Sequence, residues 1–342
     1  KSLNLEELTD QLKELGLPAF RAKQIYQWVH EKLVASFDDM TNLSKGLRDQ
    51  LKERYELITL QIVDVRISQI DGTRKYLFGL PDGHIIESVL MKYKHGNSVC
   101  ISSQVGCRMG CRFCASTLNG KVRDLRPSEM LDQIYRISRD TNERVSNVVI
   151  MGSGEPMDNY DNVIKFIELL NSERGLNISQ RNITVSTCGI VPKIKELADL
   201  KLQITLAISL HAPNDELRKT MMPIANKYSI AEIMDACRYY LDKTGRRISF
   251  EYSLVKGVND TKECANELIE LVKGLNCHIN LIPVNPIKER DYEQSEKNSI
   301  KNFKDMLERK GINATVRREM GRDIDGACGQ LRQNHIDENS AI

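Results

Sequence analysis

The sequence contains no uninterrupted apolar run of about 18 residues, the length that a transmembrane helix requires. Its first residues, Lys1 to Glu7, also lack the apolar stretch of a secretory signal peptide. Internal repeats and low-complexity segments are absent as well. We therefore expect a protein that has no membrane partner.

An excess of charge of one sign is also missing. The 49 Lys and Arg residues nearly balance the 47 Asp and Glu residues, and the net charge of +2 neither requires nor excludes a nucleic-acid partner. A hydrophobic content of 41% argues against wholesale disorder. The length of 342 residues is enough for one large domain and an accessory one.

The number and the positions of the cysteines carry more information. The total of nine is odd, and without a secretory signal it argues against a disulfide framework and predicts a reducing cytoplasm. Cys107, Cys111 and Cys114 fall within one short loop. We expect four of the others to be packing or surface thiols: Cys188, Cys237, Cys264 and Cys277.

The hydrophobic pattern divides the chain into four segments. Residues 1–57 predict a helical accessory domain, and residues 58–96 predict a small β extension with turns at Asp71-Gly72 and Pro81-Asp82-Gly83. Residues 97–331 alternate strands and helices, which predicts a parallel α/β sheet, either barrel-like or doubly wound. The polar residues 332–342 predict a disordered tail. The expected parallel strands lie near 99–102, 147–151, 183–185, 204–208, 248–252, 278–282 and 314–317, and their β-branched residues predict burial on both faces.

Unusual polar clusters follow several of these strands directly. They are Gly152 to Pro156, Ser186-Thr187, Ser209-Leu210-His211 and Asn285-Pro286, while the first strand leads into the cysteine loop. The carboxyl ends of parallel strands share one rim, where ligands bind. The sequence therefore predicts a single large site at that rim.

The cysteine loop itself places three thiolates at spacings of +4 and +3, a donor set suited to zinc or to an iron–sulfur cluster. A structural zinc needs four closed ligands, and Cys100 or His211 could be the fourth. Three cysteines are better suited to a four-iron cluster that keeps one iron open to another ligand. The plain alternative is three buried cysteines that lie close by chance.

The segment from Cys107 to Cys114 has the form Cys-x-x-x-Cys-x-aromatic-Cys, and it resembles the cluster motif of the radical S-adenosylmethionine (SAM) superfamily. That resemblance implies a partial (βα)6-type barrel, one [4Fe-4S] cluster and SAM. Other segments narrow the resemblance to the RlmN/Cfr family of radical SAM rRNA adenine methyltransferases, over nearly the whole chain. These segments are residues 100–107, 154–160, 209–214 and 323–331.

The resemblance to this family implies a role for each matching residue. Cys107, Cys111 and Cys114 would hold the cluster, and the SAM-binding residues would be Gly154, Glu155, Ser186, Ser209, Leu210, His211 and Asn285. Cys328 would take a methyl group from the first of two SAM molecules consumed, and Glu87 would remove the proton from the substituted ring carbon. Cys100 would then attack the Cys328 sulfur and leave a Cys100–Cys328 disulfide.

The same resemblance implies the partners. The substrate would be C2 of adenine 2503 in protein-free or precursor 23S rRNA, with adenine 37 of tRNA as a second substrate. The residue 1–57 domain would bind RNA, the protein would be a monomer, and a flavodoxin or ferredoxin would donate electrons.

Two segments, Gly154-Glu155-Pro156 and Ile282 to Pro286, favour this RlmN type over the Cfr type, which methylates C8 and confers antibiotic resistance. Ser153 departs from the family pattern. The alternative of another class is a non-enzymatic zinc-binding RNA protein.

Without the resemblance, several of these residues have simpler interpretations. Cys100 would be a buried small hydrophobe, Glu87 an exposed strand residue and His211 a structural histidine. Phosphate contacts and a solvated charged face are equally good interpretations of the basic residues near the cysteines. These are Arg108, Arg112, Lys121, Arg123, Arg126, Arg317, Arg318 and Arg322.

Overall fold

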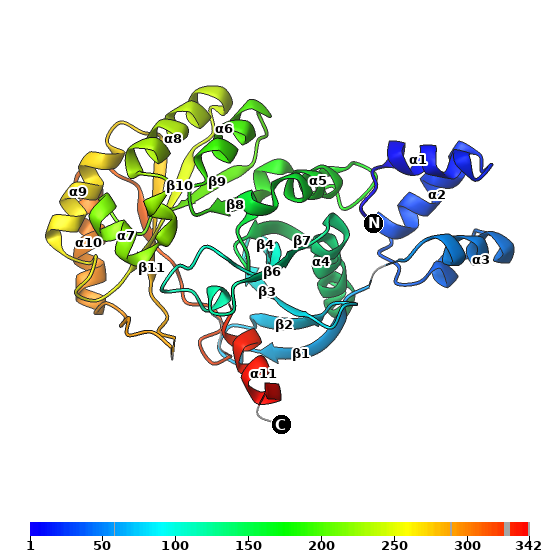
Figure 1. Ribbon diagram of the computed structural model, residues 1–342, viewed down its shortest axis with the longest axis horizontal. Coiled ribbons are helices and arrows are strands. Elements are labelled where there is room, and N and C mark those ends of the chain that lie inside the picture. Colours follow the sequence, from blue (N-terminus) through cyan, green and yellow to red (C-terminus); the bar gives the residue numbers. More distant parts are fainter. Residues whose placement is uncertain (58, 288, 325–328, 341–342) are drawn as a thin grey trace.

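A single open sheet organises the computed structural model, which describes residues 1–57, 59–287, 289–324 and 329–340 (Figure 1). Its described strands, in spatial order, are β1 (Gln61–Ile67), β2 (Arg74–Gly79), β3 (Ile85–Tyr93), β4 (Gly96–Ile101), β7 (Val145–Ile150), β8 (Ile183–Thr187), β9 (Thr205–Ser209), β10 (Ile248–Leu254), β11 (Cys277–Pro283) and β12 (Ala314–Val316). Pairing is antiparallel from β1 to β4 and parallel from β4 to β12. A separate ribbon joins β5 (Gln104–Gly106) to β6 (Lys121–Asp124).

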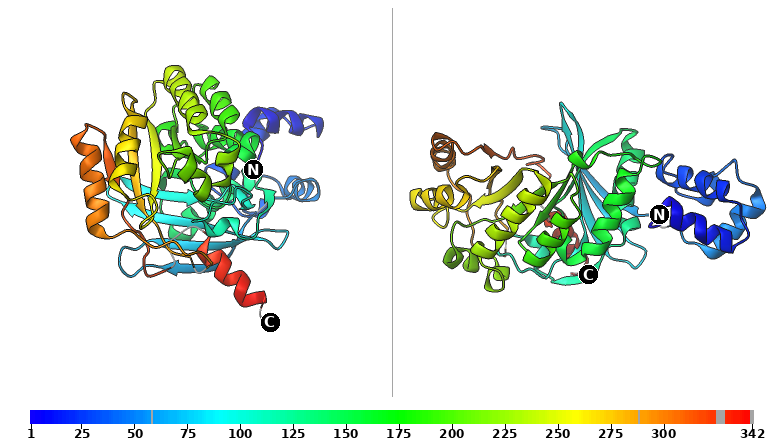
Figure 2. Two further views of the ribbon diagram at one scale, coloured as in Figure 1. Left: turned by 60° about the vertical axis from the view of Figure 1, so that its left-hand side comes forward. Right: turned by 90° about the horizontal axis from the view of Figure 1, so that it is seen from above.

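Helices connect the parallel strands and cover the outer side of the sheet (Figure 2). They are α4 (Pro127–Thr141), α5 (Tyr160–Asn171), α6 (Val191–Asp199), α7 (Asp215–Met221), α8 (Ile230–Thr244), α9 (Lys262–Val272) and α10 (Lys297–Arg309). This alternation confirms the predicted α/β fold, a partial barrel whose edge strands β1 and β12 do not pair with each other in the described chain. The sequence predicts helices at 128–141, 159–172, 192–199, 229–243, 261–274 and 297–310, and the short helix α7 is not among them.

Local sequence signals set the ends of these helices. Ser229 accepts a hydrogen bond from the backbone N–H of Glu232, whose side chain in turn accepts from the Ser229 N–H, so that α8 begins with a capping box. The same helix ends at Gly245 with φ of 64°, a left-handed conformation that glycine adopts without steric cost. These two signals explain why the expected range and the observed helix agree closely.

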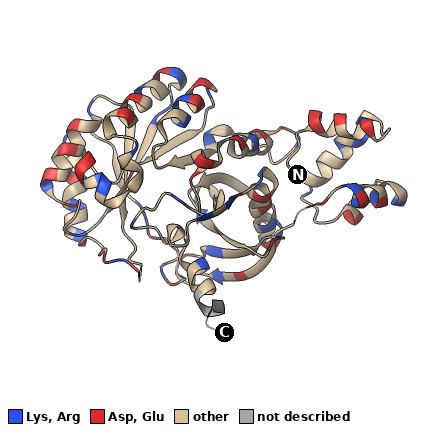
Figure 3. Ribbon diagram, viewed as in Figure 1, with Lys and Arg blue, Asp and Glu red and all other residues tan. Residues whose placement is uncertain are grey.

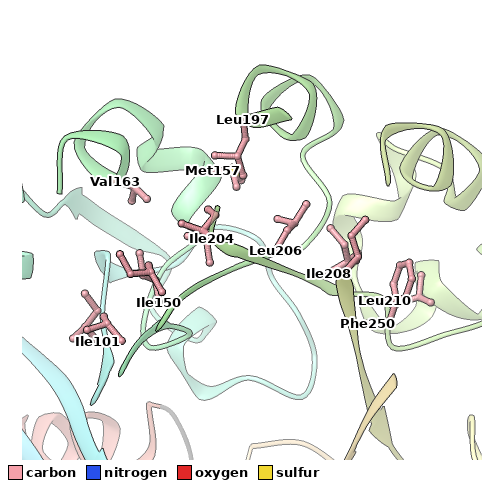
Figure 4. Packing of buried hydrophobic residues seen from close by; sticks show 14 of the residues in the cluster. Ile101, Ile150, Met157, Val163, Leu197, Ile204, Leu206, Ile208, Leu210 and Phe250 are labelled. Carbon is pink, nitrogen blue, oxygen red and sulfur yellow. The ribbon is translucent and has the colours of Figure 1, made fainter. Parts of the chain in front are cut away.

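The two faces of the parallel strands differ, which corrects the prediction of burial on both. Apolar residues of the outer face, among them Ile150, Leu206 and Phe250, pack against the helices (Figure 4). Residues one position away point to the inner face, and many of them are polar and half-buried, such as Thr184, Ser186 and Ser249. Because the barrel is open, its inner face lines a cavity rather than a second apolar layer.

The N-terminal helices form a core of their own and project from one end of the molecule, beside α4 and α5 (Figure 1). They are α1 (Leu5–Glu14), α2 (Ala19–His30) and α3 (Lys45–Arg54). His30 contacts the Tyr135 hydroxyl at 2.8 Å, and the Asn4 amide donates to Glu168 at 2.7 Å. These polar contacts attach the helical segment to the outer layer of the barrel.

The C-terminal segment corrects the prediction of a disordered tail from residue 332, because residues Gln330–Ser340 form helix α11. Its first turn is held to β3. Leu331 is buried, the Arg332 backbone N–H donates to the Glu87 carboxylate at 2.5 Å, and the Arg332 guanidinium donates to the Ile85 carbonyl at 2.9 Å. A polar sequence that is held by contacts with a distant strand has no apolar periodicity, so the helix could not be predicted from it.

The charged residues of both signs are spread over the outer helices (Figure 3). Among the described residues, no helix has the length and hydropathy that a membrane span requires.

Candidate functional site

The cysteine loop lies between β5 and β6 and is shaped by close backbone contacts. Gly106 has φ of 74°, and a Cβ atom there would stand 2.0 Å from the Gly120 carbonyl oxygen, so only glycine fits. The Cys107 N–H donates to the same carbonyl at 2.9 Å. Cys107 and Cys111 are buried and Cys114 is half-buried, and the apolar cluster around the loop includes Cys188, Met221 and Val284.

The three loop cysteines suit a metal cluster better than a single metal ion. Burial raises the pKa of the Cys107 thiol to about 12 and that of Cys111 well above its ordinary value, and neighbouring thiols add to both shifts. Ionised cysteines in this place therefore need a cation to compensate them. No three His, Cys, Asp or Glu side chains in the described part of the chain are arranged to hold one metal ion. A four-iron cluster is wider than one ion and takes each cysteine on a different iron, so the donor set fits a cluster.

Asp158 anchors the cysteine loop, a role that the sequence did not reveal. Its carboxylate forms an ion pair with Arg108 and accepts from Lys121 at 2.9 Å and from the Gln104 amide at 3.0 Å. Nearby, Arg123 pairs with both Asp82 and Glu129. These basic residues, considered above as phosphate ligands, are thus engaged with carboxylates of the protein itself.

The loop after β7 brings Gly154 and Glu155 to the same rim. A Cβ atom on Gly154, whose φ is 112°, would stand 2.7 Å from the Gln104 backbone nitrogen. Glu155 is buried, its carboxylate oxygens accept from the N–H groups of Met157 at 3.0 Å and Cys188 at 2.8 Å, and burial raises its pKa. The side chains of Thr187 and Cys188 also donate hydrogen bonds to this carboxylate, which fix its position at the rim.

The ends of β8 and β9 meet as predicted: the hydroxyl oxygens of Ser186 and Ser209 are 3.4 Å apart. Arg218 of α7 fixes the segment that follows. Its guanidinium is fully buried and donates to the carbonyls of Leu210 at 3.1 Å, Cys188 at 2.6 Å and Ser209 at 3.3 Å. The sequence does not reveal Arg218, because its guanidinium meets the backbone carbonyls of the two neighbouring loops only in the folded chain.

His211 is buried with its backbone in the left-handed region, at φ of 57°, an uncommon conformation that is concentrated at functional sites. The Ser253 N–H donates to its Nδ1 at 2.9 Å, which leaves the ring proton on Nε2. The ring packs edge-on against Phe113 of the cysteine loop, with centroids 4.6 Å apart. His211 therefore connects the β9 rim to the cysteine loop.

Asn285 differs from the other expected SAM-binding residues, because it is exposed. Its neighbour Val284 is buried in the apolar cluster around the cysteine loop. On the other side, the Pro286 carbonyl accepts from the Gln330 amide at 3.1 Å. The loop after β11 thus lies between the cysteine loop and α11, with the Asn285 side chain at the surface.

Glu87 and Cys100 lie on the same face of the neighbouring strands β3 and β4. Cys100 pairs with Val89, and side chains two residues apart on a strand share a face, which places Glu87 beside this pair. Glu87 is 4% exposed rather than an exposed strand residue, and its carboxylate lies 3.4 Å from the buried Lys75 ammonium. It accepts from the Gly329 N–H at 2.6 Å in addition to the Arg332 N–H.

Cys328, the expected methyl acceptor, lies outside the described residues. No disulfide joins two of the described residues. Cys188, Cys237, Cys264 and Cys277 are all buried, which confirms the packing interpretation and excludes the surface one.

Known proteins resemble the chain over its whole length. Residues 101–272 match the model of the radical SAM superfamily, and residues 1–57 match the N-terminal domain of the ribosomal RNA large subunit methyltransferases. A protein of Lachnospira eligens named probable dual-specificity RNA methyltransferase RlmN is 76% identical over 338 residues, covering 99% of this chain and 97% of its own. Its namesake from Lachnoclostridium phytofermentans is 64% identical and covers 99% of this chain and 95% of its own.

A solved structure extends the likeness to the fold. The crystal structure of a radical SAM methyltransferase from Sphaerobacter thermophilus superposes with a TM-score of 0.93 at 44% identity. The match covers 96% of this chain and 97% of that chain.

Proposed function

The chain belongs to the RlmN family of radical SAM RNA methyltransferases, and from that premise we propose that it methylates C2 of adenine 2503 in 23S rRNA and of adenine 37 in tRNA. The family implies a [4Fe-4S] cluster and SAM as cofactors. We propose one cluster per chain, two SAM molecules for each methyl transferred, and a flavodoxin or ferredoxin as the electron donor. The protein would act as a monomer in the cytoplasm, and the helices of residues 1–57 would bind RNA.

The observation that carries this proposal is the position of Glu87. A buried carboxylate on β3 accepts hydrogen bonds from Gly329 and Arg332, which lie more than 240 positions further along the chain. Gly329 directly follows Cys328 in the sequence. A SAM-dependent reaction that used only the cluster cysteines Cys107, Cys111 and Cys114 would not require a buried carboxylate bonded to the C-terminal segment that contains a further cysteine.

The proposed roles follow from the chemistry of methylating an electron-poor ring carbon. SAM and the cluster, when bound, would supply the methyl group and the one-electron chemistry that such a carbon requires. Cys107, Cys111 and Cys114 would hold the cluster, and the rim residues from Gly154 to Asn285 would hold SAM. Cys328 would carry the methyl group as a thioether to the base.

Release of the methylated base then needs a proton acceptor and a nucleophile. Glu87 would take the proton from the substituted ring carbon, as a carboxylate within reach of that carbon can. Cys100, on the same face of the sheet, would attack the Cys328 sulfur, so that an S–S bond forms while the bond between that sulfur and the transferred carbon breaks. The transferred carbon would take up a proton as the base leaves, and the disulfide must then be reduced.

Mass spectrometry of RNA nucleosides tests the proposal. Reconstituted enzyme would react anaerobically with a reductant, methyl-deuterated SAM and either protein-free 23S rRNA or tRNA. We expect labelled 2-methyladenosine and no 8-methyladenosine from both RNAs. Product at C8 would show the Cfr type of specificity instead. An intact cluster without any methylated adenosine would refute the substrate.

A matched pair of variants links the product to the site. Glu87→Gln keeps the size of the side chain but cannot accept a proton, and we expect it to form little product while still binding SAM. Glu293→Gln makes the same change at an exposed position and should retain wild-type activity.

A further inference from the structure

A cavity of about 510 Å³ lies on the inner face of the barrel, on the amino-terminal side of the residues expected to hold SAM. On β8 it is lined by Thr184, two positions before Ser186, and on β9 by Thr205, four positions before Ser209. Its volume is typical of ligand-binding pockets. None of the roles proposed above uses this cavity.

One wall of the cavity is apolar and lies next to Cys100. Met91, Val149 and Met151 line it, and the same residues form a small cluster with Cys100 and Val89. Flat aromatic ligands pack well against such a wall, and methionine sulfur in particular favours contact with aromatic rings. The wall therefore suits a nucleobase that approaches Cys100.

The opposite wall is polar and already ordered by hydrogen bonds. The Glu251 carboxylate accepts from the Ser249 hydroxyl at 2.8 Å and from the Asn280 amide at 2.7 Å. Glu251 is the one carboxylate among the described residues that line the cavity, and these bonds engage both of its oxygens. Glu251 also interacts electrostatically with Arg317, so this one carboxylate faces the three arginines that line the cavity.

The positive charge of the cavity comes from Arg246, Arg247 and Arg317, with His278 beside them. Arg247 is exposed, and Arg246 and Arg317 are half-buried, so the guanidinium groups border the opening of the cavity. Near the cysteine loop, Arg108 and Arg123 form ion pairs with carboxylates of the protein. The cavity combines an apolar interior with a basic border, as a nucleotide requires.

We propose that this cavity is the entrance for the substrate RNA: an unpaired nucleoside lies against the apolar wall beside Cys100, and the adjoining phosphates bind Arg247 and Arg317. Single-stranded RNA can turn a base out of its stack, and arginines hold its phosphates. The inference rests on the proposed function, since it requires that RNA be the substrate. It adds the route by which RNA enters and the residues that hold its backbone.

The test compares RNA binding by the full-length holoenzyme and its variants across a series of salt concentrations. Arg247→Gln and Arg317→Gln, alone and together, remove the border charges, and Arg247→Glu reverses one of them. Arg309→Gln, on the exposed side of α10, is the matched control for loss of one positive charge. The probe is a protein-free 23S rRNA fragment, measured by fluorescence anisotropy, with SAM affinity measured on the same samples.

We expect the double variant to bind the fragment roughly tenfold more weakly at low salt, with a slope of log K against log salt reduced by about 0.7 for each arginine. Arg247→Glu should weaken binding more than Arg247→Gln, while SAM affinity and Arg309→Gln remain at the wild-type level. Equal RNA affinity and equal slopes for wild type and double variant would overturn the entrance alone. A wild-type enzyme that binds no RNA would overturn the proposed function together with it.

Discussion

His211 makes the folded protein sensitive to acid in a way that can be calculated. Its Nδ1 accepts from the Ser253 N–H, so protonation of that nitrogen would break a buried hydrogen bond. Burial, and then the positive charge of Arg218, lower the pKa of this imidazole from 6.5 to about 3. The native state therefore excludes a proton that the unfolded chain binds.

The sign of the effect follows from the two pKa values of His211. The unfolded imidazole takes up its proton as the pH falls through about 6.5, whereas the folded one does so only near 3. The contribution to stability is complete above pH 6.5 and is lost progressively as the pH falls toward 3. Below pH 6.5 the stability falls by about 1.4 kcal/mol for each pH unit. Between pH 7 and pH 5 the loss is therefore about 2 kcal/mol, because it begins only near pH 6.5.

His211→Asn tests this value, because asparagine tolerates the left-handed backbone at this position and does not titrate. We would measure the free energy of unfolding by urea denaturation at pH 7 and pH 5, under anaerobic conditions. The wild type should lose about 2 kcal/mol more than His211→Asn between the two pH values. All other titrating groups, including the buried His30, are common to both proteins and cancel.

The result that would refute the reasoning is an equal loss of stability in wild type and His211→Asn. It would mean that the imidazole can be protonated within the fold. His95→Asn, which removes an exposed imidazole, is the control for a general effect of replacing histidine.

Other perturbations lead to equally specific results. Glu87→Gln leaves only one atom able to accept from the two backbone N–H groups of the C-terminal segment. We expect faster hydrogen exchange at those amides, seen by mass spectrometry, and a loss of methylation of about 100-fold. Gly154→Ala places a Cβ atom 2.7 Å from a backbone nitrogen in a conformation that disfavours alanine, so SAM binding measured by calorimetry should weaken at least roughly tenfold. Cys100→Ala should trap a covalent protein–RNA adduct, visible as a shifted band on a denaturing gel, whereas Cys264→Ala should turn over normally; ordinary turnover by Cys100→Ala would contradict the release step.

The elements of the barrel could be predicted because their signals are local. The alternation of apolar residues marks strands such as β7, and the capping residues Ser229 and Gly245 mark the ends of α8. The meeting of Ser186 and Ser209 followed from a topological rule alone, since both come at the ends of parallel strands. Such features need no knowledge of distant parts of the chain.

What could not be predicted depends on contacts between distant residues. Asp158 and Arg218 have ordinary sequence surroundings, and their partners become neighbours only in the folded chain. The prediction of disorder for residues 332–342 is wrong for the same reason, because contacts with Glu87 and Ile85 hold the first turn of α11. The half-buried polar residues on the inner face could not be predicted, because the sequence of a single strand does not show whether the barrel closes.

The attachment of the C-terminal segment to β1–β3 has a consequence for how the protein is made. Ser68 and the Gln69 N–H bind the Asp323 carboxylate at 2.7 and 2.9 Å, while Glu87 holds Gly329 on the other side of the segment. A ribosome would complete β1–β3 long before it added residues 323–332. Strands β1–β3 can therefore pair with one another during synthesis before their contacts with Asp323 and Gly329 exist, and these contacts form only after residues 323–332 have been added.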